Sequence, residues 1–270
     1  MTDDRNLRTQ VAGLPLSLRP FKSSRLERFG AQADGGYLVN PLDVASADGL
    51  ISFGVDRDWS FEKAFLRRNR VPVHAYDGCT SIPYLLSDIP RAVRDRNWRW
   101  ACRAILRTAD YLRFFSTSAQ HFRCFVGTAE FAFEDTAAPV VSMETVFDNM
   151  HAAGSSRPFL KVDIEGAEFF MLQQIIDRAE ETAGLAIEFH NCDARLQEVI
   201  EFVQRYPLRL VHIHANSYGG IGRTGVPRAL ELTFSSTPDM ATGFATTPHP
   251  LDRANDGHTD IPIRFDCWSS

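Results

Sequence analysis

The chain has 270 residues, 44% of them hydrophobic and 23% charged, and a formal net charge of −5. This length and composition are typical of one large globular domain with a full hydrophobic core. The negative charge gives no general attraction to phosphate backbones, so nucleic acid is not expected as a partner. The five cysteines never form a C-x-x-C pair, which argues against a zinc finger or a disulfide framework and for a reducing compartment. There is no run of about 18 apolar residues and no N-terminal signal stretch, so we expect a cytoplasmic protein without a membrane span.

Apolar runs alternate with helical periodicity along the chain. Residues 1–45 predict an irregular arm in which the Gly35-Gly36 turn leads into a strand at 37–39, and residues 236–270 predict an irregular polar tail. Helices are predicted where apolar residues recur at helical spacing, which happens around 61–65, after 165–166 and over 196–203. Strands are predicted over 50–54, 71–76, 124–126, 140–143, 159–163, 185–190, 208–214 and 229–234. This alternation predicts a single α/β domain over 1–270, with a mostly parallel sheet built from βαβ units.

Residues 80–122 separate two predicted strands by more than a minimal α/β unit requires. We expect this insertion to be helical, and it carries seven arginines between Arg91 and Arg113 with aromatic residues interleaved. Only Asp95 and Asp110 oppose those arginines between the same two positions. Two interpretations stay open: a helical pair whose arginines extend along its own surface to water, or a lid or docking face for an anionic substrate or a partner subunit.

The residues that could bind a ligand or take part in catalysis lie at the ends of predicted strands, where doubly wound sheets bind their ligands. Gly54 ends the first strand and would let a cofactor approach the backbone and the next helix N-terminus. Asp77 ends the second strand, where a carboxylate can accept both hydroxyls of a ribose. Ordinary turn chemistry is the alternative for both residues.

Three carboxylates follow the strand at 159–163 within six residues. Glu165 and Glu168 can complement the positive N-terminus of the next helix, whereas Asp163 ends the strand and should face the ligand crevice. Glu188 and His190 are two residues apart and should share one face of a strand. One strand later this spacing recurs in His212 and His214, followed by Asn216. Such a group could bind a metal through oxygen and imidazole ligands, or a histidine could abstract a proton.

Several of these segments resemble the FkbM-like methyltransferases, in the same order along residues 28–235. The most specific is Leu160-Lys161-Val162-Asp163-Ile164-Glu165-Gly166-Ala167-Glu168. The others are the Asp34-Gly35-Gly36-Tyr37 turn, Ser52-Phe53-Gly54 with Ser60-Phe61-Glu62, the segment 140–147, Ile187-Glu188-Phe189-His190, and His212-Ile213-His214-Ala215-Asn216. The resemblance implies a Rossmann-like fold, S-adenosylmethionine as methyl donor, and hydroxyl acceptors on sugars or secondary metabolites. The chain departs from the usual methyltransferase pattern after the first strand, where Val55 and Asp56 follow Gly54 in place of a G-x-G loop.

We therefore expect a Rossmann-like seven-stranded, mostly parallel sheet with helices on both faces, and an O-methyltransferase acting on a carbohydrate or related small molecule. Two other classes stay open: an NAD-dependent oxidoreductase, disfavoured because no G-x-G-x-x-G follows a strand, and a non-catalytic docking domain. Whether a Mg²⁺ ion assists and whether the chain forms a homo-oligomer are also open. The expected donor site comprises Asp34, Gly36, Tyr37, Gly54 and Asp77; the expected catalytic residues are Asp163, His190 and His214; and the expected metal ligands are Asp163 and Glu188.

Overall fold

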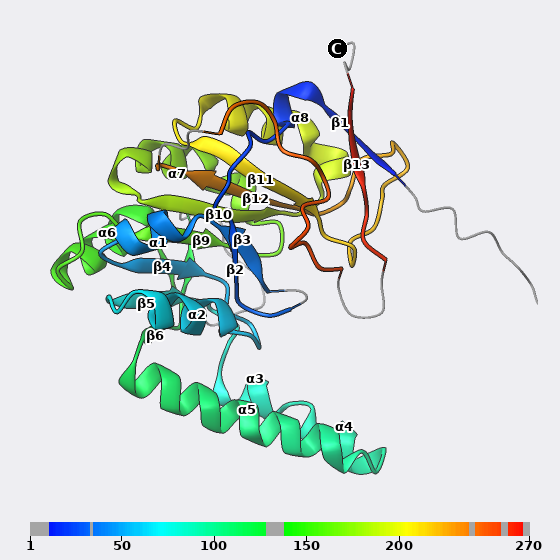
Figure 1. The fold of residues 1–270 in the computed structure, drawn as a ribbon. Helices are drawn as coiled ribbons and strands as arrows, with labels where there is room; N and C mark the ends of the chain where they lie inside the picture. Colours follow the sequence, from blue (N-terminus) through cyan, green and yellow to red (C-terminus); the bar gives the residue numbers. More distant parts are fainter. Residues whose placement is uncertain (1–10, 33–34, 128–137, 238–240, 255–258, 267–270) are drawn as a thin grey trace, which may run out of the picture.

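A computed structural model describes residues 11–32, 35–127, 138–237, 241–254 and 259–266. Its centre is a seven-stranded sheet with the order β11-β12-β10-β9-β4-β5-β6 (Figure 1). Strand β12 is antiparallel to both of its neighbours and the other six strands run in one direction, which confirms the predicted mostly parallel sheet. The strands are β4 (Leu50–Phe53), β5 (Val73–Tyr76), β6 (Gln120–Phe122), β9 (Phe159–Val162), β10 (Gly184–Phe189), β11 (Arg209–Ala215) and β12 (Leu230–Ser235).

The chain changes direction across the sheet between β4 and β9. From β4 it continues outward through β5 to β6, and it then returns to the other side of β4 as β9. This reversal of strand order leaves a crevice at the carboxyl ends of β4 and β9, because the following connections leave the sheet in opposite directions.

Apolar side chains cover both faces of the sheet, which explains why β4 and β9 are buried along their full length. On one face, Ile51 and Leu160 belong to a core that includes helices α6 (Met143–Ala152), α7 (Leu172–Asp177) and α8 (Cys192–Arg205). On the other face, Leu50 and Phe159 pack with helices α1 (Pro41–Ser46) and α2 (Ser60–Arg68) and with the hairpin of β2 (Glu27–Phe29) and β3 (Tyr37–Val39).

The insertion at 80–122 forms helices α3 (Ile82–Leu86), α4 (Ile89–Arg94) and α5 (Trp98–Thr117), followed by β6. Tyr111 and Phe114 on the inner face of α5 pack with Trp59 and Leu85. Figure 1 shows α5 on the β6 side of the sheet, at the foot of the view. No described helix meets the length and apolarity needed to cross a bilayer.

The strand predicted at 37–39 is confirmed as β3, but both ends contain more regular structure than expected. The 1–45 segment holds β1 (Ala12–Pro15), the 3₁₀ helix η1 (Leu16–Leu18), the β2–β3 hairpin and α1. In the 236–270 segment, β13 (Ile263–Asp266) pairs in parallel with β1. This pairing joins positions about as far apart as the chain allows, so local patterns of residues contain little signal for it.

Two internal elements also differ from expectation. The strand expected at 124–126 lies outside the central sheet, because β7 (Phe125–Val126) pairs with the two-residue β8 (Val140–Val141). Instead of one long helix after 165–166, the chain forms η2 (Glu168–Phe170), α7 and η3 (Ala179–Glu181).

Candidate active site

A cavity of about 510 Å³ lies where β4, β5 and β9 end. Gly54, Asp77 and Asp163, which follow these three strands, all line it. An apolar part of the wall is formed by Phe53, Tyr76, Cys124, Phe125 and Val126. The cavity therefore occupies the crevice at the reversal of strand order, where an α/β sheet binds its ligands.

Gly54 holds the end of β4 against the end of β9. Its φ is +76°, and a Cβ at this position would lie inside the van der Waals radius of the Asp163 carbonyl oxygen. Its own carbonyl accepts a 2.6 Å hydrogen bond from the Lys161 ammonium. Only glycine combines this backbone conformation with this close approach.

Asp77 lines the same cavity, but its carboxylate already has protein partners. Its two oxygens accept hydrogen bonds from the backbone N–H groups of Val55, Asp56, Cys79 and Thr80 at 2.8–3.0 Å, and from the Thr80 hydroxyl at 3.1 Å. Burial alone would raise the pKa of Asp77, but these backbone donors lower it below its usual value. Asp77 thus ties the loop after β4 to the loop after β5. Since its carboxylate already accepts five hydrogen bonds, a ribose hydroxyl would have to share or displace one of them.

The residues of the turn at 34–37 do not all lie at the cavity. Asp34 lies outside the described residues. Gly35 lines the cavity, whereas Gly36 and Tyr37 do not. Tyr37 is buried on β3, its hydroxyl 2.9 Å from Asp163 Oδ2 and 3.2 Å from Glu188 Oε2. The structure thus brings Tyr37 to the carboxylates of the expected reaction centre rather than to the wall of the cavity.

A buried ammonium stands among these carboxylates. Lys161 Nζ is 3.5 Å from Asp163 Oδ2, and Lys161 is almost wholly buried. Burial alone would lower the pKa of Lys161, but the charges of Asp163, Glu62 and Glu188 raise it above its usual value. Lys161 is therefore a fixed cation that compensates the acidic side chains around it.

The surroundings of His190 also favour its positively charged form. Its Nδ1 is 3.1 Å from Glu168 Oε1, and its backbone N–H donates to the same oxygen at 2.6 Å. Burial alone would lower the pKa of His190, but the bond with Glu168 and the charges of Glu188, Glu168 and Asp163 raise it to about 9. A pKa raised to about 9 favours the protonated imidazole near pH 7, which argues against the expected role of His190 as a general base.

Asp163, Glu165 and His190 can offer one ligand atom each within 4.8 Å of one another. This combination of two carboxylates and an imidazole differs from the expected pair, because it includes Asp163 but not Glu188. The Glu188 carboxylate instead accepts from the Asn216 amide at 2.8 Å and contacts the Tyr37 hydroxyl. Glu165 is 89% exposed in its side chain, so it can turn toward a ligand in the cavity that it lines.

His214 belongs to a second buried network on β11 and β12. Its Nδ1 is 3.2 Å from Glu231 Oε2 and its Nε2 is 2.9 Å from Asp260 Oδ1. Burial would lower the pKa of His214, but these two carboxylates raise it to about 11. Both ring nitrogens are thus occupied in an imidazolium, and His214 is not among the residues that line the cavity. His212 similarly binds Asp252 at 2.8 Å.

Sequence reasoning did not assign a site role to Lys161, Glu62 or Glu168. Lys161 could have been found, because residues 161 and 163 project from one face of a strand. Glu62 approaches the same face from α2 and accepts a 2.5 Å hydrogen bond from Ser52. Glu168 had no local signal, since its partner His190 follows 22 positions later and meets it only in the folded chain.

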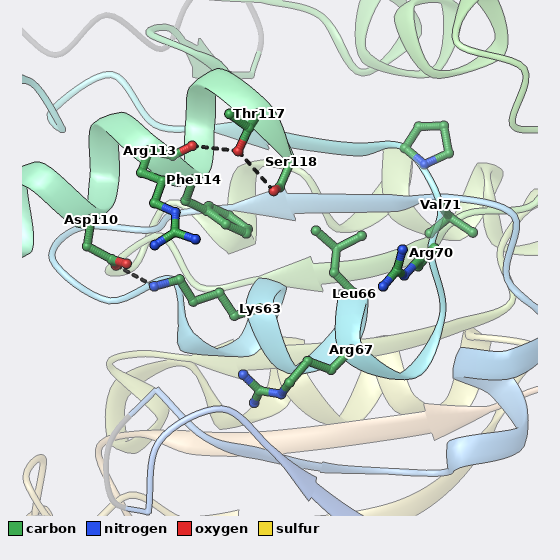
Figure 2. A pocket seen from close by; sticks show the side chains of 11 residues that line it. Lys63, Leu66, Arg67, Arg70, Val71, Asp110, Arg113, Phe114, Thr117 and Ser118 are labelled. Atoms are coloured by element: carbon green, nitrogen blue, oxygen red, sulfur yellow. Dashed lines mark hydrogen bonds and ion pairs between the residues drawn. The ribbon is translucent and has the colours of Figure 1, made fainter.

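A larger cavity of about 850 Å³ lies at the other end of the strands (Figure 2). It is bounded by α2, by the residues just before β5 and by the last turn of α5, and its cationic residues are Lys63, Arg67, Arg70 and Arg113. None of the expected site residues that the structure describes lines it. We therefore take the smaller cavity as the candidate active site.

The chain was compared with models of protein families, with curated proteins and with solved structures, and none of them matches it. The likeness to the FkbM-like methyltransferases thus stands on the motifs in the chain.

Proposed function

We propose that this chain is an S-adenosylmethionine-dependent O-methyltransferase that acts on a hydroxyl of a carbohydrate or a related small molecule. The observation that carries the proposal is the cavity at the reversal of strand order, which ends at the Asp163 carboxylate. The strand order supports a Rossmann-like fold: in chain order the seven strands lie as 3-2-1-4-5-7-6, the Rossmann order with antiparallel β12 inserted before β11.

The dimensions and chemistry of the cavity fit a nucleoside donor. Its volume of about 510 Å³ lies within the usual range for small-molecule sites. Tyr76, Phe125 and Val126 offer apolar surface for a flat base. Asp56 and Asp77 also line the cavity and offer carboxylates for ribose hydroxyls. The exposed Asp56 accepts a hydrogen bond from the Tyr84 hydroxyl, whereas Asp77 accepts five, so Asp56 has more free capacity.

In the proposed reaction, the acceptor hydroxyl oxygen attacks the sulfonium methyl carbon, the carbon–sulfur bond breaks, and sulfur keeps the electron pair. The protein must align the two reactants and receive the hydroxyl proton. Since the raised pKa values of His190 and His214 favour their protonated forms, we assign the proton to the Asp163 carboxylate. Tyr37 and Lys161 fix one oxygen of Asp163 from the buried side. His190 then acts as a cation near the developing negative charge.

A carboxylate is a weak base for a sugar hydroxyl, which is why the Asp163, Glu165 and His190 group matters. Its two carboxylates and one imidazole suit Mg²⁺ or Mn²⁺. A divalent ion held there would supply the charge that lowers the pKa of an acceptor hydroxyl. His190 must lose its proton to act as a ligand, so metal binding would release a proton.

Calorimetry with S-adenosylhomocysteine and with NAD tests the donor class. We expect saturable binding of S-adenosylhomocysteine and none of NAD. Binding of NAD alone would instead favour the oxidoreductase, and binding of neither would leave the docking domain.

Methyl transfer to a panel of sugars and glycosides tests the reaction. We expect Asp163→Asn to lower turnover by about 100-fold or more while S-adenosylhomocysteine affinity changes less than about threefold, because the proton acceptor is needed only as the hydroxyl reacts. The exposed Asp177→Asn on α7 is the matched control. Loss of turnover in EDTA that Mg²⁺ restores would support the metal-assisted version, and full turnover in EDTA would leave Asp163 acting alone. Full activity of the Asp163 variant would contradict the proposed reaction centre.

A further inference from the structure

The outer face of helix α5 carries large apolar side chains that are about half exposed or more. Along one stripe stand Trp98, Cys102, Ile105, Ala109 and Leu112, separated alternately by four and three positions. That spacing keeps the stripe on a single face of the helix. The exposed fractions are 62% for Trp98, 53% for Ile105, 68% for the adjacent Leu106 and 48% for Leu112. With 20 residues, α5 extends this stripe over about 30 Å.

A cationic stripe runs beside the apolar one. Arg99, Arg103 and Arg113 are exposed on α5, and Arg96 precedes its first turn. None of these four arginines has an ion pair with a described carboxylate, whereas Arg91, Arg94 and Arg107 are paired with Asp95 or Asp88. Arg113 also lines the basic cavity of Figure 2, so the positive surface continues from α5 to Arg67 and Arg70.

This arrangement opposes the charge of the whole molecule. The chain has a net charge of −5, yet the segment from α3 to the end of α5 contains seven arginines, three aspartates and no other charged side chain. A helix with tryptophan and leucine on one stripe and arginine beside it is the pattern of helices that lie in the interface of an anionic bilayer.

We propose that α5 docks the protein on an anionic membrane surface. Trp98, Ile105, Leu106 and Leu112 enter the headgroup region, and the unpaired arginines contact lipid phosphates. The protein binds as a peripheral protein, with α5 parallel to the surface.

The charges disfavour a second copy of the chain as the occupant of this face. If two α5 helices pack antiparallel through their apolar stripes around Ile105, Arg99 of one copy lies within one helical turn of Arg113 of the other at both ends. Each such pair of like charges destabilises the dimer. An anionic surface instead complements every unpaired arginine at once.

Flotation with vesicles tests the proposal on the full chain. We expect the protein to float with phosphatidylserine–phosphatidylcholine vesicles at low salt and not with phosphatidylcholine alone, and high salt should weaken binding. Arg99→Gln with Arg103→Gln should lower the partition coefficient by about tenfold or more, because each arginine near such a surface contributes separately. The matched control is Arg228→Gln with Arg264→Gln, two exposed arginines outside the insertion.

Tryptophan fluorescence tests the apolar stripe. Vesicles should shift the emission to shorter wavelength, and Trp98→Phe should remove most of that shift while leaving flotation nearly intact. Leu106→Glu should abolish flotation, and an unchanged circular dichroism melt would show that this variant is folded.

The proposal is overturned if wild type does not float with anionic vesicles, or if both arginine pairs affect binding equally. It is also overturned if light scattering shows a dimer that Leu106→Glu dissociates.

Discussion

At the residue scale, the candidate site is a set of charged groups that neutralise one another away from water. The pKa of Lys161 is raised by the charges of Asp163, Glu62 and Glu188, and the pKa of His190 by Glu168, Glu188 and Asp163. A buried charge persists only when it is paired and hydrogen-bonded. Each member therefore depends on the others, and changing one alters the protonation of the rest.

Replacing Asp77 tests whether this residue holds the two loops together or binds the methyl donor. Asp77→Ala leaves four backbone N–H groups without their acceptor. We expect it to lower the free energy of unfolding by about 2–4 kcal/mol, measured by urea denaturation. S-adenosylhomocysteine affinity should fall by about tenfold or more, because Val55 and Asp56 in the displaced loop also line the cavity.

The matched variant is Asp77→Asn, which keeps the shape and one acceptor oxygen and should cost less in stability. If Asp77→Ala lowers donor affinity without any loss of stability, Asp77 is a ligand rather than an organiser of the loops. Unchanged values of both quantities would contradict either role.

At the element scale, β13 joins the last described part of the chain to the core of the domain. It pairs with β1 along four residues, and Ile261 and Ile263 join the core that contains α6, α7 and α8. The segment before it supplies Asp252 and Asp260 to His212 and His214. The end of the chain therefore helps to hold one face of the sheet together.

Removing residues 261–270 tests this role. We expect β1 to lose its hydrogen-bond partner, so amides of residues 12–15 should exchange with solvent much faster. The melting temperature should fall by several degrees, since burial of two isoleucines contributes about 3–6 kcal/mol in total. Removing only residues 267–270 is the control. Unchanged exchange at 12–15 in the longer truncation would contradict the pairing.

At the scale of the whole molecule, the raised pKa of His214 couples stability to pH. Glu231 and Asp260 raise this pKa to about 11, against about 6.5 in an unfolded chain. The folded state therefore holds the proton more tightly. Its stabilising effect is complete below about pH 6.5 and is lost as pH rises toward 11.

We accordingly expect the free energy of unfolding to fall between pH 7 and pH 9 by at most about 1.4 kcal/mol per pH unit from His214. His214→Gln should be less stable than wild type at pH 7 by about 3 kcal/mol, because Glu231 and Asp260 lose their cation. The difference between the two proteins should shrink as pH rises. Parallel curves from denaturation at each pH would contradict a protonated His214.

Much of the sheet was predictable from the sequence because a strand covered on both faces must be apolar throughout. The runs at 50–54 and 159–163 meet this requirement, and they became β4 and β9 in the centre of the sheet. The chemical residues at their ends were also predictable, since parallel strands bring their carboxyl ends to one edge. Gly54, Asp77 and Asp163 line one cavity for that reason.

Protonation and long-range pairing were decided only by the tertiary structure. His190 carries its proton because the fold places Glu168, Glu188 and Asp163 around it, and His214 because Glu231 and Asp260 meet its ring. The pKa of a side chain depends on burial and on charges in space, neither of which follows from neighbours in the chain. The β1–β13 pairing likewise depends on backbone groups that every residue possesses, so its partner is selected by the packing of the whole domain rather than by its own four residues.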